Sequence, residues 1–241
     1  RVMDKLKLDQ HISQKFNEDL ENIKSQMLEM GGLVEKQLAE AIKALENADS
    51  YIAERVLKVE DQIDEMEVAI DENCVTLIAR RQPAATDLRL VMVVTRCIRD
   101  LERIGDEAQK IAKMAIKLAV DGASPRGYTE VRHISNGVRS MLNDALNAFM
   151  RFDTAAAIAT MKRDEQIDAD YKSALRELMT YMMEDPRSIT RVMNVLWVLR
   201  ALERIGDHSK NICEHVIYLV EGKDVRHGHL DEIDQKFRPE T

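Results

Sequence analysis

Apolar residues in the first part of the chain recur with the period of an α-helix. From Ile23 to Leu45 they are separated by three or four positions, which places them on one face of a helix. Similar stripes return in later segments, and turn-forming residues separate the segments. The pattern predicts six helices, over about residues 9–47, 50–80, 86–119, 128–151, 154–183 and 189–221.

The second half of this pattern retraces the first. Val138 and Leu142 stand where Val34 and Leu38 stand, at an offset of 104 residues. The densest turn composition of the chain, in residues 121–127, lies between the two halves. We therefore predict an all-α fold of two tandem three-helix bundles, with the first in residues 1–120, the second in residues 128–222, and a polar C-terminal tail in residues 223–241.

Composition supports long helices and narrows the classes of function. Of the 241 residues 45 % are hydrophobic and 4 % aromatic, and there are only nine glycines and four prolines. The net charge of −8 and the lack of a basic block argue against binding to nucleic acid or to an anionic membrane. No apolar run approaches the ~18 residues of a membrane span, so we expect no direct membrane insertion.

The three cysteines are isolated in the sequence and lie in helical contexts. Cys74, Cys97 and Cys213 form no C-x-x-C pair, and an odd number without a framework is typical of a reducing compartment. The N-terminal residues are charged and lack the apolar core of a signal peptide. We expect buried thiols in a cytoplasmic protein.

A five-residue motif, Glu-Arg-Ile-Gly-Asp, occurs twice. It runs from Glu102 to Asp106 and again from Glu203 to Asp207, 101 residues later. The two acids of each copy are four positions apart and share one face of a helix, where like charges cost roughly 0.2–0.5 kcal/mol unless they are neutralised. What neutralises them is the main functional question that the sequence raises.

The second predicted helix of each half carries its own acid pair. These pairs are Glu60 with Asp64, and Asp164 with Asp168 at the 104-residue offset, while Glu67 with Asp71 is a competing frame in the first half. If the second and third helices are antiparallel neighbours, four carboxylates converge in each half. The candidate metal ligands are Glu60, Asp64, Glu102, Asp106, Asp164, Asp168, Glu203 and Asp207.

Two explanations of the acid pairs remain open at this point. Carboxylates without Cys or His suit Mg, Mn or Fe, with Ca and Zn as alternatives, and several of them can bridge more than one metal ion. Arginines three positions before each acid of the repeated motif offer ion pairs instead: Arg99, Arg103, Arg200 and Arg204. The duplication and the position at the edge of the apolar stripe favour metal binding enough to make the two explanations about equal.

Other candidate chemistry is weaker. The single Glu-x-x-His from Glu130 to His133 lacks the partner that a di-iron bundle needs. His208 follows an acid of the second motif, but the first copy has no histidine there. Trp197 is predicted to lie in the core. We find no phosphate-binding glycine loop and no nucleophile motif, and so we expect no enzyme activity.

The two motifs in this helical frame resemble the PhoU family, the accessory and regulatory proteins of the bacterial phosphate-specific transport system. The segments 66–72, 87–93 and 178–185 are also similar to proteobacterial members. The resemblance covers about residues 11–222. It implies two three-helix bundles, often dimeric, and metal clusters held by paired acid-x-x-x-Asp motifs, which fall on the eight acids named above. The metal implied is Fe, Mn, Mg or Zn.

The resemblance also implies a role as an adaptor. PhoU-like proteins restrain phosphate uptake and repress the phosphate-starvation response when phosphate is plentiful. They are thought to link the ATPase subunit of the phosphate ABC transporter to the phosphate sensor histidine kinase. Two alternatives stand beside this role: a carboxylate-bridged metalloenzyme, and a metal-independent helical scaffold in which arginines satisfy the acids.

Overall fold

The computed structural model describes residues 2–83 and 85–225, with side chains from residue 14 onward. Within this part of the chain all regular structure is helical and no strand occurs, which confirms the all-α class. The elements are α1 (Val2–Asn47), α2 (Ser50–Arg81), α3 (Ala85–Asp121), α4 (Tyr128–Arg151), α5 (Thr154–Lys162), α6 (Asp164–Glu184), the 3-10 turn η1 (Pro186–Ser188) and α7 (Ile189–Glu221).

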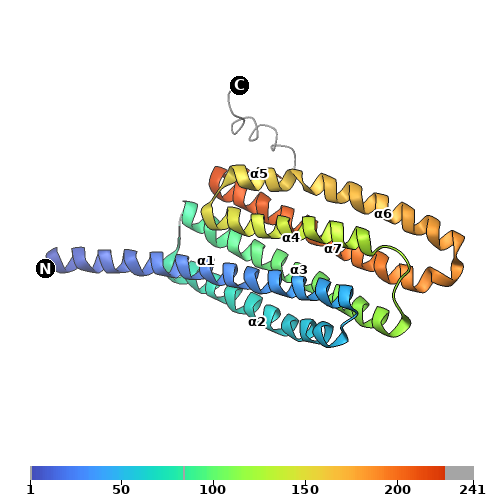
Figure 1. Cartoon of the computed structure of the whole chain (residues 1–241). Helices are drawn as coiled ribbons and strands as arrows, with labels where there is room; N and C mark the ends of the chain where they lie inside the picture. Colours follow the sequence, from blue (N-terminus) through green and yellow to red (C-terminus); the bar gives the residue numbers. More distant parts are fainter. Residues whose placement is uncertain (1, 84, 226–241) are drawn as a thin grey trace, which may run out of the picture.

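The helices form two groups that lie side by side along their length (Figure 1). Helices α1, α2 and α3 pack on one another, and α4, α5, α6 and α7 form the second group. Helix α3 packs along α7, and α1 also contacts α4. The predicted pair of three-helix bundles is confirmed as a fold, with a long shared interface.

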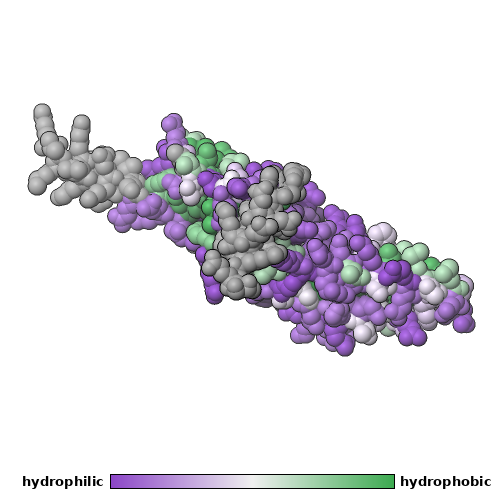
Figure 2. Space-filling model, turned by 90° about the horizontal axis from the view of Figure 1, so that it is seen from above, coloured by the Kyte–Doolittle hydropathy of each residue, from purple (hydrophilic) through white to green (hydrophobic). Residues whose placement is uncertain are grey.

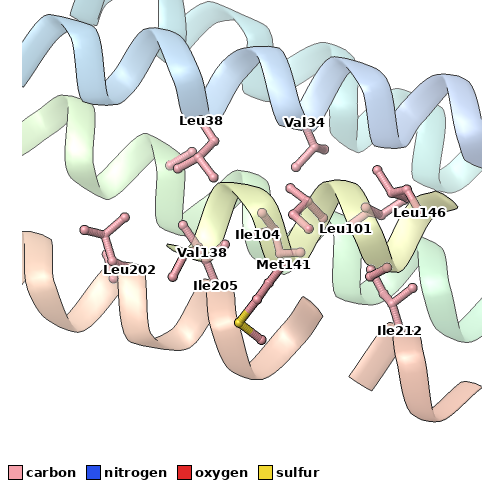
Figure 3. Close-up of a cluster of buried hydrophobic side chains, with 14 of the residues drawn as sticks. Val34, Leu38, Leu101, Ile104, Val138, Met141, Leu146, Leu202, Ile205 and Ile212 are labelled. Atoms are coloured by element: carbon pink, nitrogen blue, oxygen red, sulfur yellow. The ribbon is translucent and has the colours of Figure 1, made fainter. Parts of the chain in front are cut away.

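The core runs through both groups without a break. Figure 3 shows side chains from α1, α3, α4 and α7 directed toward one another at the centre of the molecule. The labelled residues are Val34, Leu38, Leu101, Ile104, Val138, Met141, Leu146, Leu202, Ile205 and Ile212, and all of them are buried. Because these helices share one apolar core, the hydrophobic effect that folds each half also joins the halves.

The internal repeat is visible in the backbone of the first turn of each half. Ala48 and Phe152, at the 104-residue offset, both adopt positive φ, of 51° and 54°. The aspartates that follow them cap the next helix: the Asp49 side chain accepts from the amide of Ile52 at 3.0 Å, and Asp153 accepts from Ala156 at 2.9 Å. The same local structure therefore ends the first helix and starts the second in both halves.

Three predicted features need correction. The first helix begins at Val2 rather than near residue 9, and the helix predicted over 154–183 is divided into α5 and α6 at Arg163. The division is local, since the Arg163 amide bonds to the carbonyl of Thr160, three residues back, and its guanidinium donates to Ser140 and Asp144 of α4. Trp197 is 58 % exposed and not a core residue.

The cysteines are all free and buried, which confirms the prediction of buried thiols. The part of the chain that the structure describes contains no helix with the length and apolar character needed to cross a membrane. Most of the predicted polar tail lies outside the described residues, which end at Val225.

The face of the molecule shown in Figure 2 is mostly hydrophilic, with hydrophobic residues gathered toward its two ends. A hollow of about 610 Å³ is lined by residues of α1, α3 and α7 together with the turn after α4. Its lining residues are Asn17, Leu20, Glu21, Thr86, Asp87, Leu90, Phe152, Leu219 and Val220. None of the eight candidate metal ligands belongs to this hollow.

The interface between α3 and α7 contains a buried aspartate. The carboxylate of Asp100 on α3 is bonded to three side chains of α7: His208 at 2.9 Å, Asn211 at 3.0 Å and His215 at 3.0 Å. Burial alone would raise the pKa of Asp100, but these hydrogen bonds outweigh it and hold the pKa at about 2. Asp100 is therefore ionised at neutral pH and holds the two halves together by charge-assisted hydrogen bonds.

We predict that Asp100→Ala lowers the free energy of unfolding by about 3 kcal/mol, because it leaves three polar groups of α7 without their buried partner. Urea unfolding at pH 7 measures this loss. The control is Asp144→Ala, which removes an ion pair to Arg163 from a side chain that is 45 % exposed and should cost less than about 1 kcal/mol. Equal losses in the two variants would contradict a special role for Asp100.

Candidate metal centres

The candidate centre of the first half is built where α2 crosses α3. Glu60 on α2 is only 4 % exposed, and its carboxylate lies against Gly105 of the repeated motif. A Cβ atom at residue 105 would stand 3.2 Å from both Glu60 oxygens, which is tighter than ordinary van der Waals contact. The glycine of the motif therefore makes room for the acid of the neighbouring helix.

Only one oxygen of Glu60 has a hydrogen-bond partner. Its Oε2 accepts from the side-chain amide of Gln37 on α1, whereas Oε1 is buried without a partner. Burial raises the pKa of Glu60 to about 7; the Gln37 hydrogen bond opposes the rise, and the charges of Asp106, Asp64 and Glu102 add to it. An unpartnered buried oxygen among other acids is a ready ligand for a cation.

The other acids of the first half surround Glu60 closely enough to interact. Burial raises the pKa of Asp64, and the Asp106 charge raises it further. Burial likewise raises the pKa of Glu102, with additional contributions from Asp106 and Glu67. These acids of α2 and α3 are therefore near enough to affect one another's charge, although Asp64 itself is exposed. Within the described residues, the group of carboxylate oxygens within 4.8 Å of one another lies in the second half instead.

The competing acid pair of the first half, Glu67 with Asp71, is less buried than Glu60. Glu67 is half-buried, whereas Glu60 is buried. Burial raises the pKa of Glu67, and the opposing charge of Arg99 lowers it. Because Glu60 fills the space at Gly105, the frame of Glu60 with Asp64 is the one that corresponds to the second half.

The candidate centre of the second half is the more compact. Asp164, Asp168 and Asp207 each offer a carboxylate oxygen, and these oxygens lie within 4.8 Å of one another. Asp164 is 4 % exposed, and a Cβ atom at Gly206 would stand 3.5 Å from its Oδ1. The glycine of the second motif thus also faces a buried acid, but at an ordinary van der Waals distance, whereas the contact at Gly105 is tighter.

Asp164, like Glu60, has one carboxylate oxygen without a hydrogen-bond partner. Its Oδ1 is buried without a partner, while Oδ2 accepts from the Lys210 ammonium at 3.0 Å. Burial raises the pKa of Asp207, and the charges of Asp164 and Asp168 raise it further. Glu203 stands beside this group but is outside the set of oxygens within 4.8 Å, and its carboxylate is paired with Arg200 at 2.8 Å.

The arginines satisfy only part of the acid charge. Arg103 pairs with Glu102 at 3.5 Å, and Arg200 pairs with Glu203. Arg204, predicted to serve Asp207, instead reaches across the interface to the buried Glu107 at 3.1 Å. These ion pairs leave the buried oxygens Oε1 of Glu60 and Oδ1 of Asp164 without a partner, so arginines alone do not account for the site.

The two histidines singled out in the sequence, His133 and His208, do not join the carboxylate groups. His208 bonds to Asp100 in the interface, and His133 approaches Asp170 at 3.0 Å. Neither therefore supplies the Glu-x-x-His chemistry of a di-iron bundle.

Two side chains at the centres were not foreseen from the sequence. Gln37 lies on the first helix, outside every acid motif, and nothing in its local sequence marks it. Lys210 could have been noticed, because it follows the motif glycine by four residues, where the first half has Gln109.

The donor set fits a hard or intermediate cation. Carboxylate oxygens are the preferred ligands of Mg²⁺, Mn²⁺ and Ca²⁺, and they also bind Fe and Zn. Each half supplies one buried oxygen without a partner and further acids from the facing helix. Glu60, Asp64, Glu102 and Asp106 would hold a metal in the first half, and Asp164, Asp168 and Asp207, with Glu203 adjacent, in the second.

Comparison with known proteins gives consistent matches. The PhoU domain model matches the chain twice, over residues 27–115 and 131–216. The chain is 59 % identical to a phosphate-specific transport system accessory protein PhoU homolog of Pseudomonas putida, over 94 % of this chain and 88 % of that protein. It is 46 % identical to the phosphate-specific transport system accessory protein PhoU of Escherichia coli K12, over 97 % and 96 %.

Solved structures agree with the sequence matches. The crystal structure of PhoU from Pseudomonas aeruginosa has a TM-score of 0.85 and 57 % identity, covering 86 % of this chain and all of that one (100 %). The phosphate transport system regulatory protein PhoU from Streptococcus pneumoniae has a TM-score of 0.81 and 31 % identity, covering 87 % and 99 %.

We predict that Glu60→Gln changes how stability depends on pH. The pKa of Glu60 is about 7 in the folded chain against 4.5 as its ordinary value, so the folded state holds the proton more tightly. Proton binding by Glu60 therefore stabilises the folded state fully below pH ~4.5. This stabilisation is lost as the pH rises to about 7, and the loss in the free energy of unfolding is on the order of 2–3 kcal/mol. In chelator, Glu60→Gln should be more stable than wild type by that amount at pH 8 and nearly equal to it at pH 4.5.

Urea unfolding across this pH range, with metal removed, measures the difference. The control is Asp61→Asn, since Asp61 is the exposed neighbour on the same helix and its removal should leave the wild-type profile unchanged. Parallel profiles for wild type and Glu60→Gln would show that Glu60 is not protonated by burial.

Proposed function

The chain belongs to the PhoU family, and from this membership we propose that it is an accessory protein of a phosphate transport system. The observation that carries the proposal is the close match to such accessory proteins along nearly the whole chain, with both halves matched separately by the family model.

We further propose that the protein regulates rather than catalyses. In this role it restrains phosphate uptake and represses the phosphate-starvation response when phosphate is plentiful. Its partners are the ATPase subunit of the phosphate ABC transporter and the phosphate sensor histidine kinase, which places it in the cytoplasm, and it works as a homodimer. Long helices with broad exposed faces support this role, because they provide wide surfaces for docking.

The two carboxylate centres are part of the proposal. We infer that each binds a metal ion of the Mg, Mn, Fe or Zn class, as a structural or regulatory element. The support is the pair of buried, unpartnered oxygens, Oε1 of Glu60 and Oδ1 of Asp164, each set against a glycine of the repeated motif. Bound metal would neutralise acids whose pKa values burial and mutual repulsion raise.

The alternatives have less support. A carboxylate-bridged metalloenzyme needs a substrate pocket at the metal, whereas the hollow of about 610 Å³ includes none of the candidate ligands. A metal-independent scaffold needs arginines to satisfy the acids, and the nearest arginines leave the two buried oxygens without partners.

We predict that deleting the gene in its native host raises alkaline phosphatase activity in phosphate-rich medium, and that the wild-type chain restores repression. The double variant Glu60→Gln with Asp164→Asn keeps the shape of both buried side chains and removes their charge. It should fail to restore repression if the metal centres serve regulation.

The matched control is Asp61→Asn with Glu165→Gln, which alters the exposed acid that follows each buried one and should restore repression. Circular dichroism and immunoblotting confirm folding and abundance. An unchanged phosphatase level in the deletion strain would overturn the regulatory role. Full repression by the buried-acid variant would retain that role and remove the metal centres from it.

A further inference from the structure

The two centres compensate their buried carboxylates in different ways. In the second half, the Oδ2 atom of Asp164 receives a charged donor, the ammonium of Lys210 at 3.0 Å. In the first half, the corresponding oxygen of Glu60 receives a neutral donor, the amide of Gln37. The buried acid of the second centre therefore has a cationic partner, whereas the buried acid of the first centre has a neutral one.

The difference follows from one position of the repeat. Lys210 comes four residues after Gly206, so it lies one helical turn beyond the glycine against which Asp164 packs. The matching residue in the first half is Gln109, four residues after Gly105. The side-chain oxygen of Gln109 accepts from Lys113 at 2.6 Å, so this residue brings no charge of its own to Glu60.

We propose that Lys210 is a built-in competitor for metal in the second centre, so that the two centres bind the same divalent cation with unequal affinity. This inference rests on the proposed metal binding. A cation that binds the open Oδ1 of Asp164 competes with the Lys210 ammonium on Oδ2 for the charge of the same carboxylate, and its binding is favoured when that ammonium leaves. The first centre takes up its ion without breaking an ion pair to its buried acid.

The surroundings of Lys210 suit such an exchange. Its side chain is 37 % exposed, so the ammonium can move into water when a metal ion arrives. Two other basic side chains of the second centre pair with its less buried acids. Lys172 lies 3.8 Å from Asp168 and is 69 % exposed, and Arg200 pairs with Glu203. Among the described residues, Lys210 is thus the basic side chain that forms an ion pair with the buried Asp164.

Titration of the full chain with Mn²⁺ alone tests the proposal, with free Mn²⁺ followed by electron paramagnetic resonance. Lys210→Gln, which installs the first-half residue, should tighten the weaker binding step by about tenfold, the scale of one charge-assisted hydrogen bond to a carboxylate. Lys210→Arg keeps the charge and should bind as wild type does. Lys172→Gln removes an equal charge from an exposed position and should change affinity by less than about threefold.

Two further variants assign the binding steps to the centres. Adding Asp164→Asn to Lys210→Gln should abolish the tightened step, whereas adding Glu60→Gln should leave it in place. Gln109→Lys makes the reverse exchange and should weaken the tighter step. It also keeps the proposal falsifiable if Lys210→Gln proves unstable.

Thermal unfolding, measured first in chelator and then with added Mn²⁺, gives a second readout. In chelator, Lys210→Gln should have a lower melting temperature than wild type, because Asp164 loses its cation, and added Mn²⁺ should raise that temperature by more than it does in wild type. Mn²⁺ binding in the first half with no tightening by Lys210→Gln overturns the competition alone, as does equal tightening by Lys172→Gln. Absence of Mn²⁺ binding in every variant overturns the metal centres and the competition together.

Discussion

A buried carboxylate next to a helix glycine is the feature around which each half is arranged. Transfer of such a group away from water is costly unless it is neutralised. Each half of the chain nevertheless places one acid, Glu60 or Asp164, between two helices and keeps one of its oxygens without a partner. A glycine within a helix costs about 1 kcal/mol relative to alanine. At Gly105 this cost makes space for Glu60, whereas a Cβ atom at Gly206 would only reach ordinary van der Waals contact with Asp164. Both halves therefore keep a buried carboxylate with an open oxygen beside a helix glycine.

The interface between α3 and α7 ties these two positions together. Asp100, two residues before the first motif, is held by His208, which directly follows the second motif. Glu107, which directly follows the first motif, is held by Arg204 of the second. The residues beside the two motifs thus bind each other, and the shared core of α1, α3, α4 and α7 encloses these contacts. A displacement of one motif along its helix would strain buried hydrogen bonds to the other half.

Sequence reasoning recovered the features that depend on period and repetition. Spacing along α1 and α4 identified their buried faces, and the offset of 104 residues identified Asp164 and Asp168, whose carboxylates lie near that of Asp207. Sequence reasoning failed where contacts between helices determine the local structure or the exposure of a side chain. The break at Arg163 depends on hydrogen bonds to α4, and the exposure of Trp197 depends on which face of α7 the neighbouring helices leave open. Gln37 was missed because a neutral side chain on another helix carries no local signal.

The departures from symmetry are informative because the repeat supplies a reference for each of them. Both halves keep a glycine, Gly105 or Gly206, beside the buried acid, and the space it leaves is tight at Glu60 and looser at Asp164. Where they differ, as at Gln109 and Lys210, the donor to the buried acid changes: Lys210 of the motif helix donates to Asp164, whereas Glu60 accepts from Gln37 of α1. A duplicated site that needed only stability would gain from the same ion pair in both halves. Retaining the cation in one half alone makes the two carboxylate groups chemically distinct within one continuous fold.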